Sequence, residues 1–233
     1  MVGLVPRRDE VDLLADKVGV QVDFISPWNE PNHPAFLQPQ RARCSATAKA
    51  VSPRAYARLV RAARLELRPH QTLVLGSLAG LQRPRTFGAG VAEFVRGLPH
   101  DVACLDVPFA QHAYIGVPAR DGRSPRAASA AAAPRHGLLD SAIAALDSKN
   151  CGHLKPLWIA ETGTFDHRCR AMSAALRSWS VNPRIDAAFQ FTFRESRDYP
   201  VGLVSPSLLD TYGSYRAWSA FAGSPRVLPD DPC

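Results

Sequence analysis

The chain has 233 residues, of which 46% are hydrophobic and 21% are charged. These values are typical of a globular protein and exclude a fully disordered or fibrous chain. The length favours one sizeable core over two ordinary domains. No stretch approaches the roughly 20 consecutive apolar residues that a membrane span requires, so we expect no membrane association.

The chain is basic, with a formal net charge of +7, but its cations are scattered along the sequence. The densest group lies in residues 54–68, where arginines recur every three or four residues and share one face of a predicted helix. A solvated helix face is favoured over a phosphate-binding surface, and we expect no nucleic-acid partner. The first eight residues do not resemble a secretory signal, so secretion is expected only if a longer natural form carries one.

Hydrophobic periodicity predicts strands and helices in alternation. The predicted strands cover residues 20–26, 72–77, 105–114, 156–161 and 187–193. The predicted helices cover residues 7–17, 52–67, 87–98, 136–148, 169–180 and 208–222, and a long loop is predicted at 120–134. This alternation favours parallel strands with helical crossovers, arranged either as an open doubly wound sheet or as a (β/α) barrel.

Polar residues stand where several of the predicted strands end. Asn29 and Glu30 follow the first strand, His112 and Tyr114 end the third, and Glu161 ends the fourth. In parallel α/β folds the functional groups gather at the carboxyl ends of the strands, so the two carboxylates are expected at the rim of a cleft. The first strand is not followed by a G-x-G-x-x-G motif, and no two histidines have metal-ligand spacing, so neither a cofactor nor a metal is expected.

Three motifs together resemble the retaining glycoside hydrolases of clan A, whose fold is a (β/α)8 TIM barrel. They are Trp28-Asn29-Glu30-Pro31-Asn32, His112-Ala113-Tyr114, and Glu161 within Trp158-Ile159-Ala160-Glu161-Thr162-Gly163. In that clan an Asn-Glu pair ends strand four, strand six supplies a His-x-Tyr, and a second Glu ends strand seven. The resemblance implies an α/β fold of the TIM-barrel type that covers strands four to eight only. It also implies one partial catalytic domain at 1–223 and a tail at 224–233.

The resemblance further implies hydrolysis of O-glycosidic bonds by a retaining double displacement. Glu30 would be the acid/base and Glu161 the nucleophile. The implied partner is an oligosaccharide, a polysaccharide or a simple glycoside.

The remaining roles follow from the same resemblance. Asn29 would bind the sugar 2-hydroxyl, Tyr114 would donate to the nucleophile, and His112 would line the same subsite. Trp28 or Phe193 would stack on a sugar ring. The tryptophan that often ends strand eight in the clan is absent here or replaced by a phenylalanine.

Other interpretations stay open. Taken alone, Glu30 fits a rim carboxylate paired with an arginine, and Glu161 fits a cap of the following helix. Five strands cannot close an eight-stranded barrel. A mis-assigned start codon, a gene fragment or a half-barrel that pairs with another chain would explain the missing strands. The alternatives to an active enzyme are therefore a non-catalytic carbohydrate-binding fragment and a partner-dependent half-barrel.

Five widely spaced cysteines without a C-x-x-C pair argue against a zinc ribbon. On the strand assignment that the resemblance implies, Cys104 and Cys151 each come just before one of two adjacent strands. We expect these two residues to form a disulfide. A Cys44–Cys169 bridge is a second hypothesis, with Cys233 left free. Such bridges would suit a secreted enzyme.

Overall fold

The computed structural model describes residues 22–81, 88–116, 136–222 and 233. By its contacts the chain divides into two compact units. Unit 1 holds Met1–Gln111 and Asp140–Leu157, and unit 2 holds His112–Leu139 and Trp158–Cys233. The single catalytic domain expected at 1–223 therefore stays a prediction. None of the helices in these described ranges is long and apolar enough to cross a membrane.

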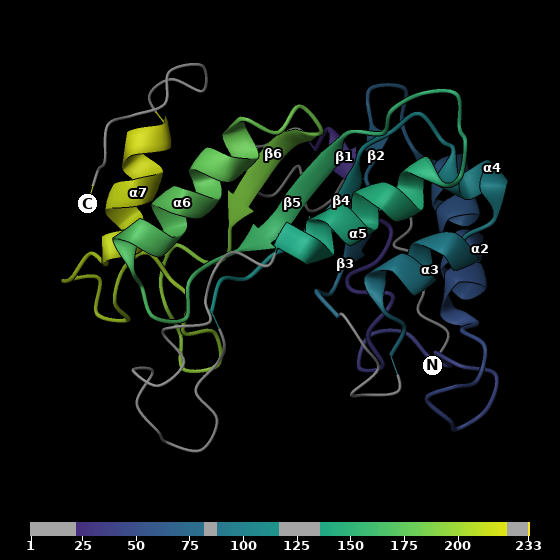
Figure 1. The fold of residues 1–233 in the computed structure, drawn as a ribbon, viewed down its shortest axis with the longest axis horizontal. Coiled ribbons are helices and arrows are strands. Elements are labelled where there is room, and N and C mark those ends of the chain that lie inside the picture. Colours follow the sequence, from purple (N-terminus) through teal and green to yellow (C-terminus); the bar gives the residue numbers. More distant parts are fainter. Residues whose placement is uncertain (1–21, 82–87, 117–135, 223–232) are drawn as a thin grey trace. The chain divides into compact units, whose positions relative to one another are not determined.

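Strands and helices alternate along the described chain, as the periodicity predicts (Figure 1). Unit 1 contains β1 (Phe24–Ile25), α2 (Ser52–Glu66), β2 (Thr72–Leu73), β3 (Leu75–Leu78), α3 (Val91–Gly97), α4 (His100–Ala103), β4 (Phe109–His112) up to Gln111, and most of α5 (His136–Asp147). Unit 2 contains β5 (Leu157–Thr162) from Trp158 onward, α6 (Cys169–Ser180), β6 (Ile185–Gln190) and α7 (Gly213–Ala222).

The strands pair in parallel. In unit 1, β1 lies beside β2 and β3 lies beside β4, where Leu75 is opposite Phe109. In unit 2, β5 neighbours β6, and the amide of Phe191 directly after β6 donates to the carbonyl oxygen of Thr162 at 2.8 Å. Parallel strands separated by helices confirm the predicted mixed α/β class.

Several element boundaries differ from the prediction for local reasons. The strand expected at 105–114 is shorter, and β4 begins only at Phe109, because Pro108 has no N–H to donate to a ladder. The last helix begins at Gly213 and not at residue 208, because the amide of Ser205 donates to the carbonyl oxygen of Asp210 and closes a loop there. Outside the described residues lie the predicted helix at 7–17 and the predicted loop at 120–134.

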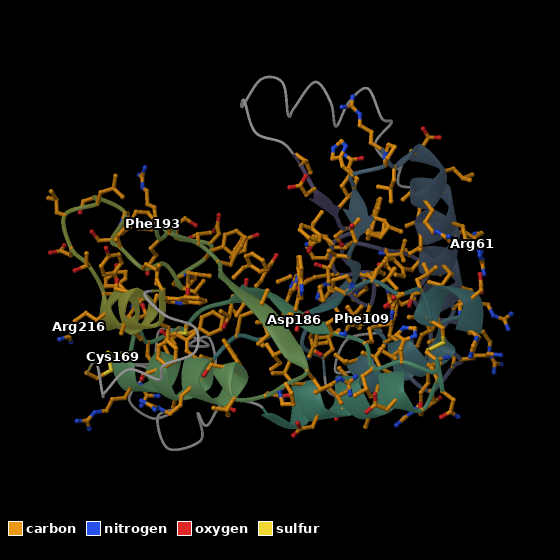
Figure 2. All side chains as sticks on the ribbon, turned by 90° about the horizontal axis from the view of Figure 1, so that it is seen from above. Arg61, Phe109, Cys169, Asp186, Phe193 and Arg216 are labelled. Atoms are coloured by element: carbon orange, nitrogen blue, oxygen red, sulfur yellow. A yellow bond between two sulfur atoms is a disulfide. The ribbon has the colours of Figure 1, made fainter. Side chains whose placement is uncertain are left out.

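Helix α2 packs its apolar face into the core of unit 1. Tyr56 is fully buried, and its ring lies 5.7 Å from the ring of Phe94 in α3. The Tyr56 hydroxyl accepts a hydrogen bond of 2.8 Å from the amide of Gly76 in β3, and burial raises the pKa of this phenol. The other face of α2 carries the predicted row of arginines, which are exposed. Arg61 points outward in Figure 2 and forms two hydrogen bonds of 2.9 Å with Asp101.

Two disulfides pair four of the five cysteines. The expected Cys104–Cys151 disulfide is present in unit 1. The second joins Cys169 at the start of α6 to Cys233, and both belong to unit 2. The expectations of a Cys44–Cys169 bridge and a free Cys233 are therefore wrong, and Cys44 is the free, exposed thiol. The physical reason is that Cys233 lies at the start of α6, where its sulfur bonds to that of Cys169, so Cys169 is not available to Cys44.

Lys155 is buried in unit 1, where its Nζ donates to the carbonyl oxygens of Leu105 and Val107, the latter at 3.1 Å. Burial lowers the pKa of Lys155 to about 8, against the opposing effect of the Asp106 carboxylate. In the unfolded chain a lysine titrates near pH 10.4. Between about pH 8 and pH 10 the unfolded state therefore binds more protons, and stability rises with pH.

We expect this pH dependence to disappear when Lys155 is replaced by methionine, which keeps a similar length without the charge. The free energy of unfolding is measured in urea at pH 8 and at pH 10. Between these two values it should rise more in the wild type than in Lys155→Met. An equal change in both proteins would contradict the assignment of this effect to Lys155.

Candidate active site

The loop after β1 carries Trp28, Asn29 and Glu30 in unit 1. The amide of Glu30 donates to the carbonyl oxygen of Ser77 in β3 at 2.9 Å, so the loop is held where β3 ends. The φ angle of Glu30 is 44°, a left-handed conformation that residues other than glycine seldom adopt. Glu30 is half-buried and Asn29 is exposed. The loop therefore presents both polar side chains at the surface of unit 1.

Trp28 precedes this pair and is half-buried. Its indole N–H donates to the carbonyl oxygen of Phe36 at 3.0 Å. This donor is thus used within the loop.

Three of the predicted residues come together in unit 2. The Tyr114 hydroxyl donates to the Oε2 atom of Glu161 at 2.7 Å, and the Nδ1 atom of His112 lies 3.3 Å from the same oxygen. A backbone hydrogen bond explains this arrangement: the amide of Ala113 donates to the carbonyl oxygen of Glu161 at 2.8 Å and places the two segments side by side. The residues on either side of Ala113 point to one face of the strand. They orient the carboxylate, whose side chain stays 22% exposed while that of His112 is 1% exposed.

Aromatic rings pack around Tyr114 in unit 2. Its ring lies 5.9 Å from that of Phe165 and 6.5 Å from that of Phe191, and Tyr199 meets Phe191 edge-on at 5.2 Å. Phe193, which was predicted to stack on a sugar, is 59% exposed and labelled in Figure 2. Phe191, the ring beside Tyr114, was not predicted. The predicted strand runs to residue 193 and places Phe191 inside it, whereas β6 ends at Gln190.

The segment that carries Phe193 and Tyr199 is connected through His167 to Tyr212, the residue before α7. His167 Nε2 contacts Glu195 Oε2, and the ring of His167 stacks on that of Tyr212 with a centroid distance of 3.9 Å. Burial and the neighbouring carboxylates raise the pKa of Tyr212, chiefly through Glu195 among the charges. His167 therefore connects Glu195, which lies between Phe193 and Tyr199 in the chain, to the residue before α7.

The predicted site residues thus fall into two sets. One set lies on a single loop of unit 1 and comprises Trp28, Asn29 and Glu30. The other belongs to unit 2 and comprises His112, Tyr114, Glu161 and Phe193. The structure brings His112, Tyr114 and Glu161 into contact, whereas the joint action of Glu30 and Glu161 stays a prediction.

The left-handed backbone at Glu30 has a measurable consequence. A side chain with a Cβ atom costs about 1 kcal/mol or more in this conformation, and glycine does not. We therefore expect Glu30→Gly to be about 1 kcal/mol more stable than Glu30→Ala, although both variants lack the carboxylate. Urea unfolding followed by circular dichroism measures this difference. A less stable glycine variant would show that the loop relaxes to an ordinary φ angle.

Comparison with known proteins gives structural relatives only. The sequence matches no protein-family model and no curated protein. An endo-β-1,4-glucanase of Xanthomonas axonopodis pv. citri matches with a TM-score of 0.51 and 11% identity, over 91% of this chain and 76% of that one. A β-porphyranase of glycoside hydrolase family 86 from Bacteroides plebeius matches with a TM-score of 0.50 and 16% identity, over 85% of this chain and 39% of that one.

A third relative is an exo-β-1,3-glucanase of family GH128 from Aureobasidium namibiae, with a TM-score of 0.49 and 13% identity, over 94% of this chain and 72% of that one. At these identities the glucanase and the porphyranase inform on the fold alone. The chain therefore has a mixed α/β fold with parallel strands that is similar to the fold of glycoside hydrolases.

Proposed function

We propose that the protein hydrolyses O-glycosidic bonds with retention of anomeric configuration. The observation that carries this proposal is the Glu161 carboxylate, oriented by the Tyr114 hydroxyl at 2.7 Å and by His112 Nδ1 at 3.3 Å. Glu161 is partly accessible at the end of β5, the edge where α/β folds place their chemistry. The similarity of fold to glycoside hydrolases supports the same reaction class.

The proposed reaction has two displacements. In the first, a Glu161 oxygen bonds to the anomeric carbon while the glycosidic C–O bond breaks, and Glu30 gives its proton to the departing oxygen. In the second, the Glu30 carboxylate takes a proton from water, whose oxygen attacks the same carbon and releases Glu161. This mechanism requires the two carboxyl groups to stand about 5–5.5 Å apart when substrate is bound.

The neighbouring residues take supporting roles in this proposal. Asn29 binds the sugar 2-hydroxyl, an interaction that strengthens in the oxocarbenium-like transition state. His112 lines the subsite beside Glu161. Trp28 and Phe193 offer ring faces to sugars, and carbohydrate is the proposed partner. In this proposal the chain corresponds to strands four to eight of a (β/α)8 barrel, with residues 224–233 as a tail.

One observation favours a second candidate, a half-barrel that needs a partner chain for activity or that only binds carbohydrate. Phe24 on β1 is 51% exposed and Phe189 on β6 is 47% exposed. Aromatic residues on strands are usually covered by neighbouring elements. Further chain segments beside each of these strands would cover the rings, and without such segments the chain would bind a sugar without turning it over.

The test is hydrolysis of a panel of aryl glycosides and β-glucans, with the configuration of the first product read by proton NMR. Retention in the wild type, together with loss in Glu161→Gln, is the expected result. An inverted product would contradict the double displacement. Binding of oligosaccharides without any turnover would instead support the second candidate.

A further inference from the structure

Two residues after Glu30, the side chain of Asn32 is completely buried in unit 1. Its Nδ2 atom donates to the carbonyl oxygens of Ala79 at 2.9 Å and Ala89 at 3.2 Å, and its Oδ1 atom accepts from the amide of Ala79 at 2.8 Å. The backbone oxygen of Asn32 also accepts from the amide of Ala89 at 3.0 Å. One side chain therefore joins the Glu30 loop to two other segments.

A second buried amide, that of Gln40, holds Pro31, the residue between Glu30 and Asn32. The Nε2 atom of Gln40 donates to the carbonyl oxygens of Pro31 at 2.8 Å and Leu37 at 2.7 Å, and Gln40 is only 4% exposed. Its Oε1 atom accepts from the amide of Ala89 at 3.3 Å. A buried polar network whose members are satisfied makes a rigid and specific arrangement. The chain that follows Glu30 is thus held by side-chain amides at two successive residues.

These bonds act on a residue whose own backbone is unfavourable. Glu30 has a φ angle of 44°, and its amide bonds to the carbonyl oxygen of Ser77 at 2.9 Å. A left-handed non-glycine residue persists only where the surrounding structure imposes it, and such residues concentrate at functional sites. The network around Asn32 supplies this constraint.

We propose that Asn32 is a positioning residue, which holds the loop so that the Glu30 carboxyl group meets the departing glycosidic oxygen. This inference rests on the proposed function. Asn32 is buried and bonded entirely to backbone atoms, so it does not touch the sugar. A displacement of a catalytic group by about 1 Å costs about 100-fold in rate. Loss of Asn32 therefore weakens acid catalysis while the nucleophile in unit 2 keeps its own contacts.

A leaving-group series distinguishes this role from a general structural one. A phenyl glycoside needs a proton on its departing oxygen, whereas 2,4-dinitrophenolate leaves without one. For Asn32→Ala we expect kcat/KM to fall about 100-fold on the phenyl glycoside and less than about threefold on the dinitrophenyl glycoside. Glu30→Ala should show the same pattern with a larger difference between the two substrates.

Two further variants keep the test decisive. Gly88→Ala leaves the amide intact but puts a methyl group 2.8 Å from the Asn32 carbonyl oxygen, so it should shift the same loop and give the same leaving-group dependence. Removal of the Cys104–Cys151 disulfide by two serines destabilises unit 1 elsewhere, and should affect both substrates equally. Circular dichroism of each variant at the assay temperature shows that it is folded.

The outcomes distinguish a failure of the positioning role of Asn32 from a failure of the proposed function. If the wild type cleaves both substrates but Asn32→Ala and Gly88→Ala lower both rates equally, or leave both unchanged, the positioning role is wrong and the proposed function stands. If the wild type cleaves neither substrate, the proposed function fails and the positioning role fails with it.

Discussion

Replacement of Glu161 by alanine is expected to lower kcat/KM for aryl glycosides by at least about 10⁴-fold, the loss typical of a missing nucleophile. Tyr114 and His112 hold one oxygen of this carboxylate at 2.7 and 3.3 Å, and neither can replace it as an attacking group. The variant should keep its fold, because Glu161 is a half-buried residue near the end of β5. Steady-state rates with a dinitrophenyl glycoside measure the effect.

Azide provides a sharper readout of the same variant. Alanine leaves room where the carboxylate stood, and a small anion can attack the anomeric carbon from that side. We expect sodium azide to restore turnover in Glu161→Ala and to give a glycosyl azide of inverted configuration, visible by NMR. Restoration with a retained product would place the nucleophile elsewhere.

The companion variant Glu30→Ala should behave differently. It should lose about 10²- to 10⁴-fold on phenyl glycosides, which is the usual contribution of general acid catalysis, and much less on dinitrophenyl glycosides. Glu66→Ala, at an exposed carboxylate at the end of α2, is the matched control and should leave both rates unchanged. Equal behaviour of Glu30→Ala and Glu161→Ala would contradict their separate roles.

The second large effect concerns stability. Replacing Cys104 and Cys151 with serine is expected to lower the free energy of unfolding by about 4 kcal/mol. The bridge spans a sequence separation of 47 residues, and opening a loop of this length restores much conformational entropy to the unfolded chain. Urea unfolding without reducing agent measures the difference from the wild type.

Two controls accompany this variant. Cys44→Ser removes the exposed free thiol and should change the unfolding free energy by less than about 0.5 kcal/mol. Thiol titration of the unreduced wild type should find one reactive thiol per chain, since the other four cysteines are paired. A serine pair that unfolds at the wild-type urea concentration would show that the Cys104–Cys151 bridge adds no stability.

Local patterns predicted the elements well and their limits less well. The apolar runs of β3 and β5 and the helical spacing of Tyr56 and Val60 in α2 are readable in the chain, because periodicity reflects which faces are buried. The start of α7 at Gly213 was not readable, because it depends on a hydrogen bond between Ser205 and Asp210. Such loop contacts form between residues whose types alone do not specify a partner.

For the site, the motifs pointed to Tyr114 and Glu161 although they are 47 positions apart. Their contact was predictable because parallel strands bring their carboxyl ends to one edge. The partner of Cys169 was not predictable, since its disulfide joins positions with a sequence separation of 64 that no local pattern relates. That Phe191, and not Phe193, lies beside Tyr114 was likewise not predictable. It depends on the direction in which each side chain points after the strand.

By itself the sequence determined the α/β class, the order of strands and helices, and the identity of the groups that stand at strand ends. These features follow from periodicity and from local chemistry, which are properties of neighbouring residues. The tertiary structure alone decided the pairing of Cys169 with Cys233, the left-handed backbone of Glu30 and the buried hydrogen bonds of the Asn32 side chain. Each of these depends on contacts between segments that are distant in the chain. The partners of a buried amide such as Asn32 become visible only when the carbonyl groups that it joins are in place.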